Sequence, residues 1–134
     1  MNGSPLPRWV RLYATLVGAM DFSTGVALIA APALTLRLMG AVVPGAEALT
    51  LVRLVGVFVG AVGASYLVAL RGAETTLRAV LGFTLLVRAS VGTFAGIAVA
   101  IGLFDRGWLM VAVTDLACAG VQAWLLGRGG RSDG

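Results

Sequence analysis

The chain has 134 residues, of which 59% are hydrophobic and only 12% are charged, and its mean hydropathy is +0.97. Soluble domains contain about 45–50% apolar and about 25% charged residues, so this composition indicates an integral membrane protein. His is absent, every basic residue is an arginine, and Cys118 is the single cysteine. These counts exclude imidazole and amine catalysis, a disulfide within the chain, and a thiolate metal cage, so no metal site is expected.

The first apolar segment covers residues 9–31 and ends at Pro32. It is longer than the roughly 7–15 apolar residues of a signal peptide, and it carries Asp21 near its centre. We therefore interpret it as the first membrane-spanning helix.

A short helix is expected directly after this span. Pro32 is suited to begin a helix and Gly40 to end it, while Leu34 and Leu38 lie one turn apart. This pattern predicts a helix that lies in the membrane interface.

Three further spans follow, at residues 49–70, 77–104 and 108–126. Each is long enough to cross a hydrocarbon core of about 30 Å. The Gly- and Arg-rich residues 127–134 are expected to be disordered. The sequence thus predicts an all-α fold, an integral membrane four-helix bundle with a short interfacial helix after the first span, in a single transmembrane domain over residues 1–134.

The arginines predict the orientation of this bundle. Four spans place both termini on one side, together with the connection between the second and third spans. That side carries six arginines, and the other carries Arg37 and Arg106, with Arg53 just inside the membrane; the six are Arg8, Arg11, Arg71, Arg78, Arg128 and Arg131. By the positive-inside rule we expect a multi-pass protein of the cell inner (plasma) membrane with cytoplasmic N- and C-termini. Arginines at helix ends form no basic patch, so no nucleic-acid partner is expected.

Four charged residues remain inside the predicted spans: Asp21, Arg53, Arg88 and Asp115. A charge at this depth costs about 2.5–3.5 kcal/mol, so each is expected to face the bundle interior and to have a partner. Their positions predict a layer in the outer half of the bilayer, in which depth pairs Asp21 with Arg88 and Arg53 with Asp115. Gln122, on the same face as Asp115, extends the layer. These five residues are a candidate ligand-binding site or charge network, or they only fix the helix register.

Glycines predict where helices approach closely. Gly56 and Gly60 lie on one face of the second span, and Gly92 and Gly96 lie on one face of the third. Such small-xxx-small pairs are packing devices in membrane helices, and we expect all four glycines at helix contacts.

Two short motifs mark the end of the first span and the start of the second: Gly25-x6-Pro32-x-Leu34-x-Leu36-x-Leu38-x-Gly40 and Arg53-x2-Gly56-x3-Gly60. Together with the size and the number of spans, they resemble the DoxX-like small four-helix membrane proteins. The resemblance implies a compact left-handed bundle, sometimes associated with quinone-linked redox enzymes. It assigns no catalytic residue to a position of this chain.

The leading functional hypothesis is a non-enzymatic accessory or ligand-binding subunit, in the lipid bilayer and within a larger membrane complex or a homo-oligomer. Its arginines suit an anionic or carbonyl-bearing ligand such as a quinone or a lipid headgroup, and no other cofactor is expected. The alternative is a small proton- or ion-coupled transporter or channel that uses Asp21, in a position similar to the acid of four-helix multidrug exporters. Acid–base catalysis by carboxylates with Tyr13 or Tyr66 ranks third.

Overall fold

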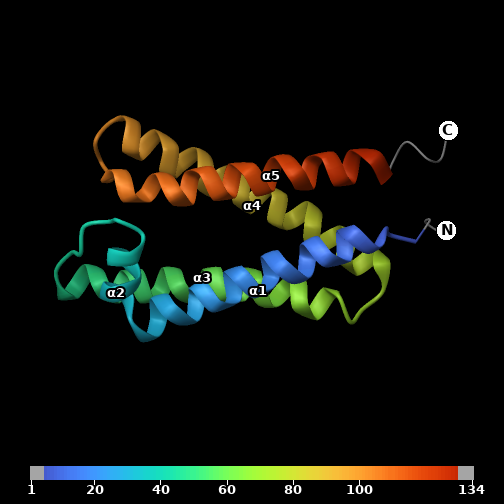
Figure 1. Ribbon diagram of the computed structural model, residues 1–134, viewed down its shortest axis with the longest axis horizontal. Helices are drawn as coiled ribbons and strands as arrows, with labels where there is room; N and C mark the ends of the chain where they lie inside the picture. The colour runs from blue at the N-terminus through green and yellow to red at the C-terminus, as the bar shows by residue number, and fades with distance from the viewer. Residues whose placement is uncertain (1–4, 130–134) are drawn as a thin grey trace.

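The computed structural model describes residues 5–129 as an all-α protein (Figure 1). The elements are α1 (Arg8–Ala30), α2 (Pro32–Leu38), α3 (Ala46–Ala69), α4 (Glu74–Ala100), a 3-10 helix η1 (Arg106–Trp108) and α5 (Leu109–Gly129). Four of these helices are long and apolar enough to cross a membrane. The predicted fold class, a four-helix membrane bundle with a short helix after the first span, is confirmed.

The positions of the helix ends are determined more by local turn geometry than by hydropathy. α4 ends at Ala100, before the predicted position 104, because Gly102 adopts a positive φ of 78° and the amides of Leu103 and Phe104 both donate to the Ala98 carbonyl. α5 continues to Gly129, so residues 127–129 are helical and the prediction of disorder is wrong there. Residues 130–134 lie outside the described part of the chain.

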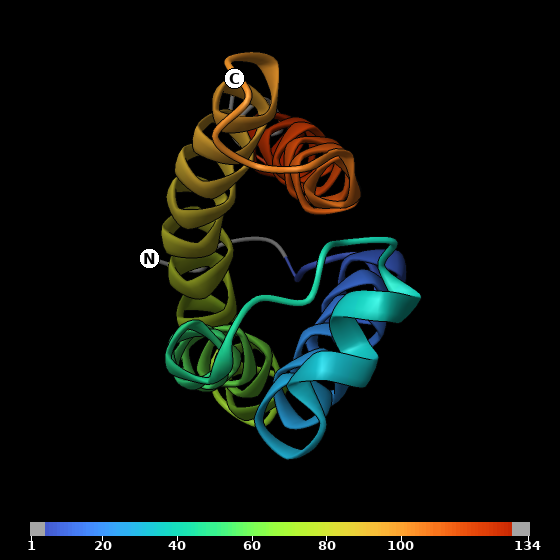
Figure 2. The ribbon, with the colours of Figure 1, turned by 90° about the vertical axis from the view of Figure 1, so that its left-hand side faces the viewer.

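The four long helices are arranged as two pairs, α1 with α3 and α4 with α5 (Figures 1 and 2). Glycines allow the backbones of α1 and α3 to approach closely. A Cβ atom on Gly25 of α1 would lie 2.5 Å from the Cα atom of Gly60, and one on Gly56 would lie 2.8 Å from the Cβ atom of Leu28. Backbones that approach so closely gain dispersion contacts that lipid-exposed helices lack.

The second pair uses the predicted glycines of α4. A Cβ atom on Gly92 would lie 2.8 Å from Cγ of Leu116, and one on Gly96 would lie 3.9 Å from the Cβ atom of Ala112. Gly56, Gly60, Gly92 and Gly96 therefore all lie at helix contacts, as the spacing predicted.

The pairs meet where both ends of the described chain lie, which we call the terminal end (Figure 1). A buried apolar cluster joins all four long helices there, and the rings of Trp9 and Trp124 lie 5.4 Å apart. The cluster contains Val10, Ala14, Val17, Tyr66, Ala69, Leu77, Leu81 and Leu125. This end of the bundle is packed as a conventional core.

A different contact joins the pairs at the opposite end, which we call the α2 end. The loop after α2 reaches η1, where Asp105 accepts a hydrogen bond from the amide of Val42 at 3.1 Å and from that of Gly107 at 2.9 Å. A Cβ atom on Gly107 would lie 2.4 Å from the backbone nitrogen of Ala41, so no side chain fits at Gly107. Trp108 packs against the cluster of Leu28, Leu36, Ala41 and Val52.

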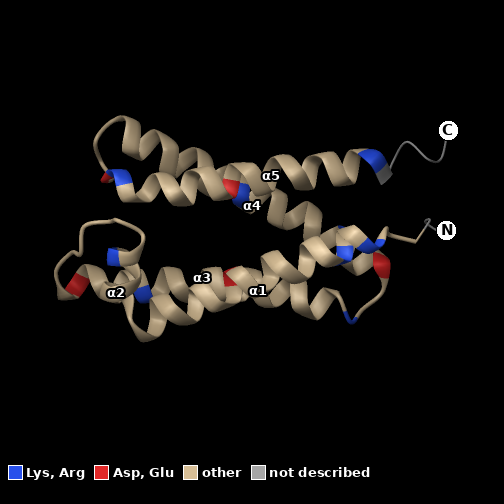
Figure 3. Cartoon of the chain, viewed as in Figure 1, with Lys and Arg blue, Asp and Glu red and all other residues tan. Residues whose placement is uncertain are grey.

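Charged residues gather at the two ends and in one central group (Figure 3). The outward sides of the long helices instead present large apolar side chains, such as Leu16 of α1, Phe83 of α4 and Val113 of α5. An apolar surface of this extent is unfavourable in water, so a lipid environment accounts for it.

Candidate functional site

Arg88 of α4 is the centre of the polar group inside the bundle. One terminal nitrogen of its guanidinium forms an ion pair with Asp21 of α1, and the other donates to Oδ1 of Asp115 of α5 at 2.6 Å. Arg88 is 3% exposed. The predicted Asp21–Arg88 pair is therefore present, and we call Asp21, Arg88 and Asp115 the charged triad.

The predicted pair of Arg53 with Asp115 is wrong. Arg53 is exposed on the side of α3, where its Nε donates to the carbonyl of Ile29 at 3.1 Å. That carbonyl belongs to the last turn of α1, whose final carbonyls have no partner within the helix and attract a positive charge. Arg53 lies on the same face as Gly56 and Gly60, and that face is turned to α1, so Arg53 reaches α1 and not α5.

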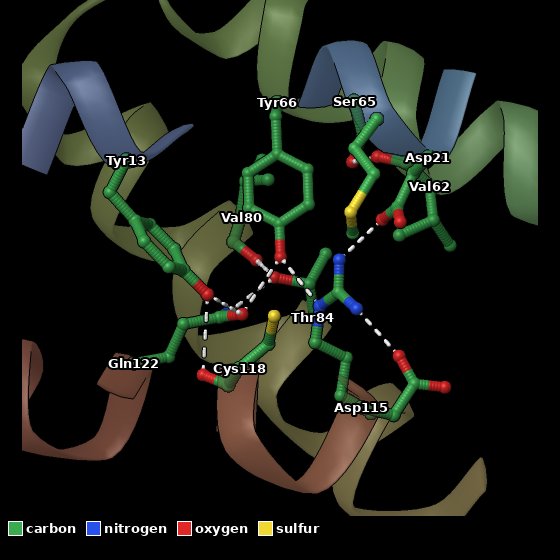
Figure 4. Close-up of polar contacts among 12 residues, drawn as sticks. Tyr13, Asp21, Val62, Ser65, Tyr66, Val80, Thr84, Asp115, Cys118 and Gln122 are labelled. Carbon is green, nitrogen blue, oxygen red and sulfur yellow. Dashed lines mark hydrogen bonds and ion pairs between the residues drawn. The ribbon is translucent and has the colours of Figure 1, made fainter. Parts of the chain in front are cut away.

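A chain of hydrogen bonds extends the triad to Tyr66, Gln122 and Tyr13 (Figure 4). Nε of Arg88 donates to the hydroxyl of Tyr66 of α3 at 3.2 Å, and that hydroxyl donates to Oε1 of Gln122 of α5 at 2.9 Å. The hydroxyl of Tyr13 of α1 lies 3.0 Å from the same oxygen. We call the charged triad and the side chains joined to it by these hydrogen bonds the polar layer. It includes a residue from each of the four long helices.

Gln122 has its amide group fully engaged in this layer. It is completely buried, and its Nε2 donates to the Leu81 carbonyl at 2.8 Å and to Oγ1 of Thr84 at 2.9 Å. A carbonyl only accepts hydrogen bonds, so the Leu81 contact fixes which end of the amide faces α4. Gln122 therefore lies in the polar layer, as predicted, with a structural role that locks α5 onto α4.

The sequence interpretation missed Tyr66 as a member of this layer. Tyr66 follows Gly63 by about one helical turn. Gly63 faces α1, since a Cβ atom there would lie 2.3 Å from the Phe22 nitrogen. The face already assigned to the glycines of α3 was the signal that would have identified Tyr66.

The charged triad lines one large cavity between the helix pairs, which we call the central cavity. Its volume is about 890 Å³, and residues from α1, α2, α3, α4, η1 and α5 form its walls. The walls extend from Asp21, Arg88 and Asp115 toward the α2 end, and they are mostly apolar with a few hydroxyls such as Thr24 and Thr114. This size and composition are typical of sites for small organic molecules.

The charged triad contains two carboxyl groups and one guanidinium. The Asp21 and Asp115 side chains are 11% and 18% exposed, against 3% for Arg88, so the carboxyl groups are the more accessible members. Tyr13 and Tyr66 do not line the cavity. Within residues 5–129, no group of three or more acidic, His or Cys side chains is placed to hold a metal ion. The site can hold and orient a polar group of a bound molecule.

Comparisons with known proteins identify no relative of this chain. The chain matches no protein-family model, and no curated protein or solved structure shows significant similarity to it.

Proposed function

We propose that this chain is a non-enzymatic, multi-pass protein of the cell inner membrane that binds a small amphipathic molecule in the central cavity. The observation that carries the proposal is the position of the charged triad at one end of a cavity of about 890 Å³ with largely apolar walls. Such a cavity fits a ligand with a large apolar part and one polar group, a form that quinones and lipids share.

The location of the charges supports ligand binding over a purely structural lock. An ion pair that only fixes helix register is expected to be buried among packed side chains. A carboxyl group that faces a cavity adds nothing to such a structural role. Here the structural lock is supplied by Gln122, Tyr66 and Thr84, which are all fully packed. Asp21 and Asp115 instead lie on the cavity wall.

Enzymatic acid–base chemistry has less support. It requires a proton donor or acceptor within hydrogen-bond reach of the bound molecule. Tyr13 and Tyr66 are directed to Gln122 and lie away from the cavity wall. The carboxyl groups both contact Arg88, which favours a binding role for them.

Proton- or ion-coupled transport that uses Asp21 is the second candidate. The observation that favours it is the excess of carboxyl groups over guanidinium groups in the charged triad, which leaves a place for one exchangeable cation. Transport also requires access to the cavity from both sides of the membrane, and the buried cluster fills the bundle at the terminal end.

The wider setting is part of the same proposal. The six arginines that the sequence assigns to the side of the termini support cytoplasmic termini and an α2 end that faces outward. A DoxX-like relationship and a place as an accessory subunit in a larger membrane complex or a homo-oligomer fit a small binding protein of this kind. Each of these statements rests on the sequence motifs and the arginine distribution.

The test compares two tryptophan substitutions on α4. Val91 lines the cavity, while Leu86 is directed outward and is 64% exposed. We expect Val91→Trp to fill the cavity and to abolish retention of a small molecule that wild type and Leu86→Trp retain. Mass spectrometry of organic extracts from purified protein, before and after incubation with a quinone or a phospholipid, provides the measurement. Equal retention by both variants would contradict the proposal.

A further inference from the structure

We propose that the ligand of the central cavity is an organic cation with apolar substituents, held by Asp21 and Asp115. This inference rests on the proposed binding function and adds the charge of the ligand to it. It reverses the preference for an anionic or carbonyl-bearing ligand that follows from the sequence alone.

The first step of the argument is the charge balance of the site. The sequence pattern suggested two acids and two bases, which would cancel. In the structure Arg53 lies against the last turn of α1, so the charged triad retains two carboxyl groups for one guanidinium. With both carboxylates ionised the site carries one net negative charge inside the membrane, which a bound cation would neutralise.

The second step concerns which charges a ligand meets. Each of the three guanidinium nitrogens of Arg88 already has an acceptor in the protein: Asp21, Asp115 and the hydroxyl of Tyr66. Two of the five N–H groups of the guanidinium remain, but the side chain is only 3% exposed and two carboxyl groups lie beside it, so an anionic ligand has little access to them. A cation instead meets the more accessible carboxyl groups without breaking any of these contacts.

The third step concerns the walls. Phe94, Phe104 and Trp108 all line the cavity and form a continuous aromatic group, with ring centroids 5.9 Å apart for the first pair and 5.0 Å for the second. Aromatic faces attract organic cations and also accommodate apolar substituents. A strongly hydrated inorganic cation would gain nothing from such walls, so the ligand is an organic cation.

Two probes of matched shape and opposite charge test the inference. Tetraphenylphosphonium and tetraphenylborate have the same four phenyl groups around a positive and a negative centre. We expect the phosphonium to bind the detergent-solubilised full chain about tenfold more tightly than the borate, or better, after subtraction of binding to the cavity-filled Val91→Trp variant. Equilibrium dialysis measures both probes under identical conditions.

Substitutions in the site test which residue causes the preference for the cation. Asp115→Asn removes the excess charge and leaves the Asp21–Arg88 pair intact, so the phosphonium should lose about tenfold in affinity. Asp115→Glu keeps the charge and should keep the preference. Glu47→Gln is the matched control, because Glu47 is exposed at the start of α3 and does not line the cavity.

The outcomes separate this inference from the function on which it rests. Equal or tighter binding of tetraphenylborate, or a preference that Asp115→Asn leaves unchanged while the variant remains folded, would overturn the inference and leave a binding cavity. Binding of a neutral quinone alone would do the same. If neither ion, a quinone nor a phospholipid binds, the proposed function itself fails. Should Asp115→Asn not fold, the comparison of the two ions on wild type still decides.

Discussion

The hydroxyl of Tyr66 on α3 lies 2.9 Å from Oε1 of Gln122 on α5, and both side chains are completely buried. This hydrogen bond crosses between the two helix pairs at the level where they pack together. The same hydroxyl accepts from Nε of Arg88, so Tyr66 connects the charged triad to the packed terminal end.

Tyr66→Phe should destabilise the protein by about 1–3 kcal/mol, because it leaves Nε of Arg88 without its acceptor in a buried environment. Tyr13→Phe should cost less, since Tyr13 is only half-buried and Gln122 retains its bond to Tyr66. Unfolding in mixed detergent, followed by circular dichroism, compares the two variants. A larger loss for Tyr13→Phe would show that the hydroxyl of Tyr66 contributes little.

Removal of the central guanidinium should have the largest effect of any charge change. Arg88→Ala strands two carboxyl groups, and loss of one partner from a buried ion pair costs about 3–5 kcal/mol. Arg53→Ala should cost about 1 kcal/mol, because that side chain is exposed and contacts one carbonyl. Thermal unfolding in detergent measures both, and equal losses would contradict the different environments of the two arginines.

Compensation distinguishes a triad from a simple pair. Arg88→Gln with Asp21→Asn still leaves Asp115 without a positive partner, so this double variant should recover only part of the lost stability. Addition of Asp115→Asn should recover more. Full recovery in the double variant would show that Asp115 does not depend on Arg88.

Two alanine substitutions test the contact between α1 and α3. A Cβ atom on Gly25 would lie 2.5 Å from the Gly60 backbone, whereas one on Gly60 would lie 3.7 Å from Gly25, which is an ordinary contact distance. Gly25→Ala should therefore cost about 1–3 kcal/mol by forcing the helices apart, and Gly60→Ala should be close to neutral. Melting temperatures in detergent rank the two variants, and the reverse order would place the contact elsewhere on the helices.

Cysteine labelling tests the proposed orientation. In a Cys118→Ala background, a cysteine introduced at Ser132 should react with a membrane-impermeant reagent only after the cells are opened, and one at Gly45 should react in intact cells. The physical reason is the excess of arginines near the terminal end. Labelling of position 132 in intact cells would reverse the orientation.

Hydropathy and helix-end chemistry predicted the four spans and the short helix at Pro32, because both depend on local sequence. Depth along the helices also predicted the Asp21–Arg88 pair. Depth fixes how far a residue lies along a helix but not which neighbour its face meets, and the prediction for Arg53 was wrong for that reason. Gln122 was predicted to extend the layer, but its hydrogen bonds to Tyr13, Tyr66 and Thr84 depend on how four helices are placed together, which the pattern within one helix does not give.

The loop contact at the α2 end makes the bundle mechanically asymmetric. At that end the pairs are joined by the Asp105–Val42 hydrogen bond, the close approach of Gly107 to Ala41 and the packing of Trp108. At the terminal end they are joined by a buried core and by the hydrogen bonds of Gln122. The α2 end has the smaller buried cluster, so loss of the Asp105–Val42 hydrogen bond is expected to separate the two pairs there before it affects the core at the terminal end.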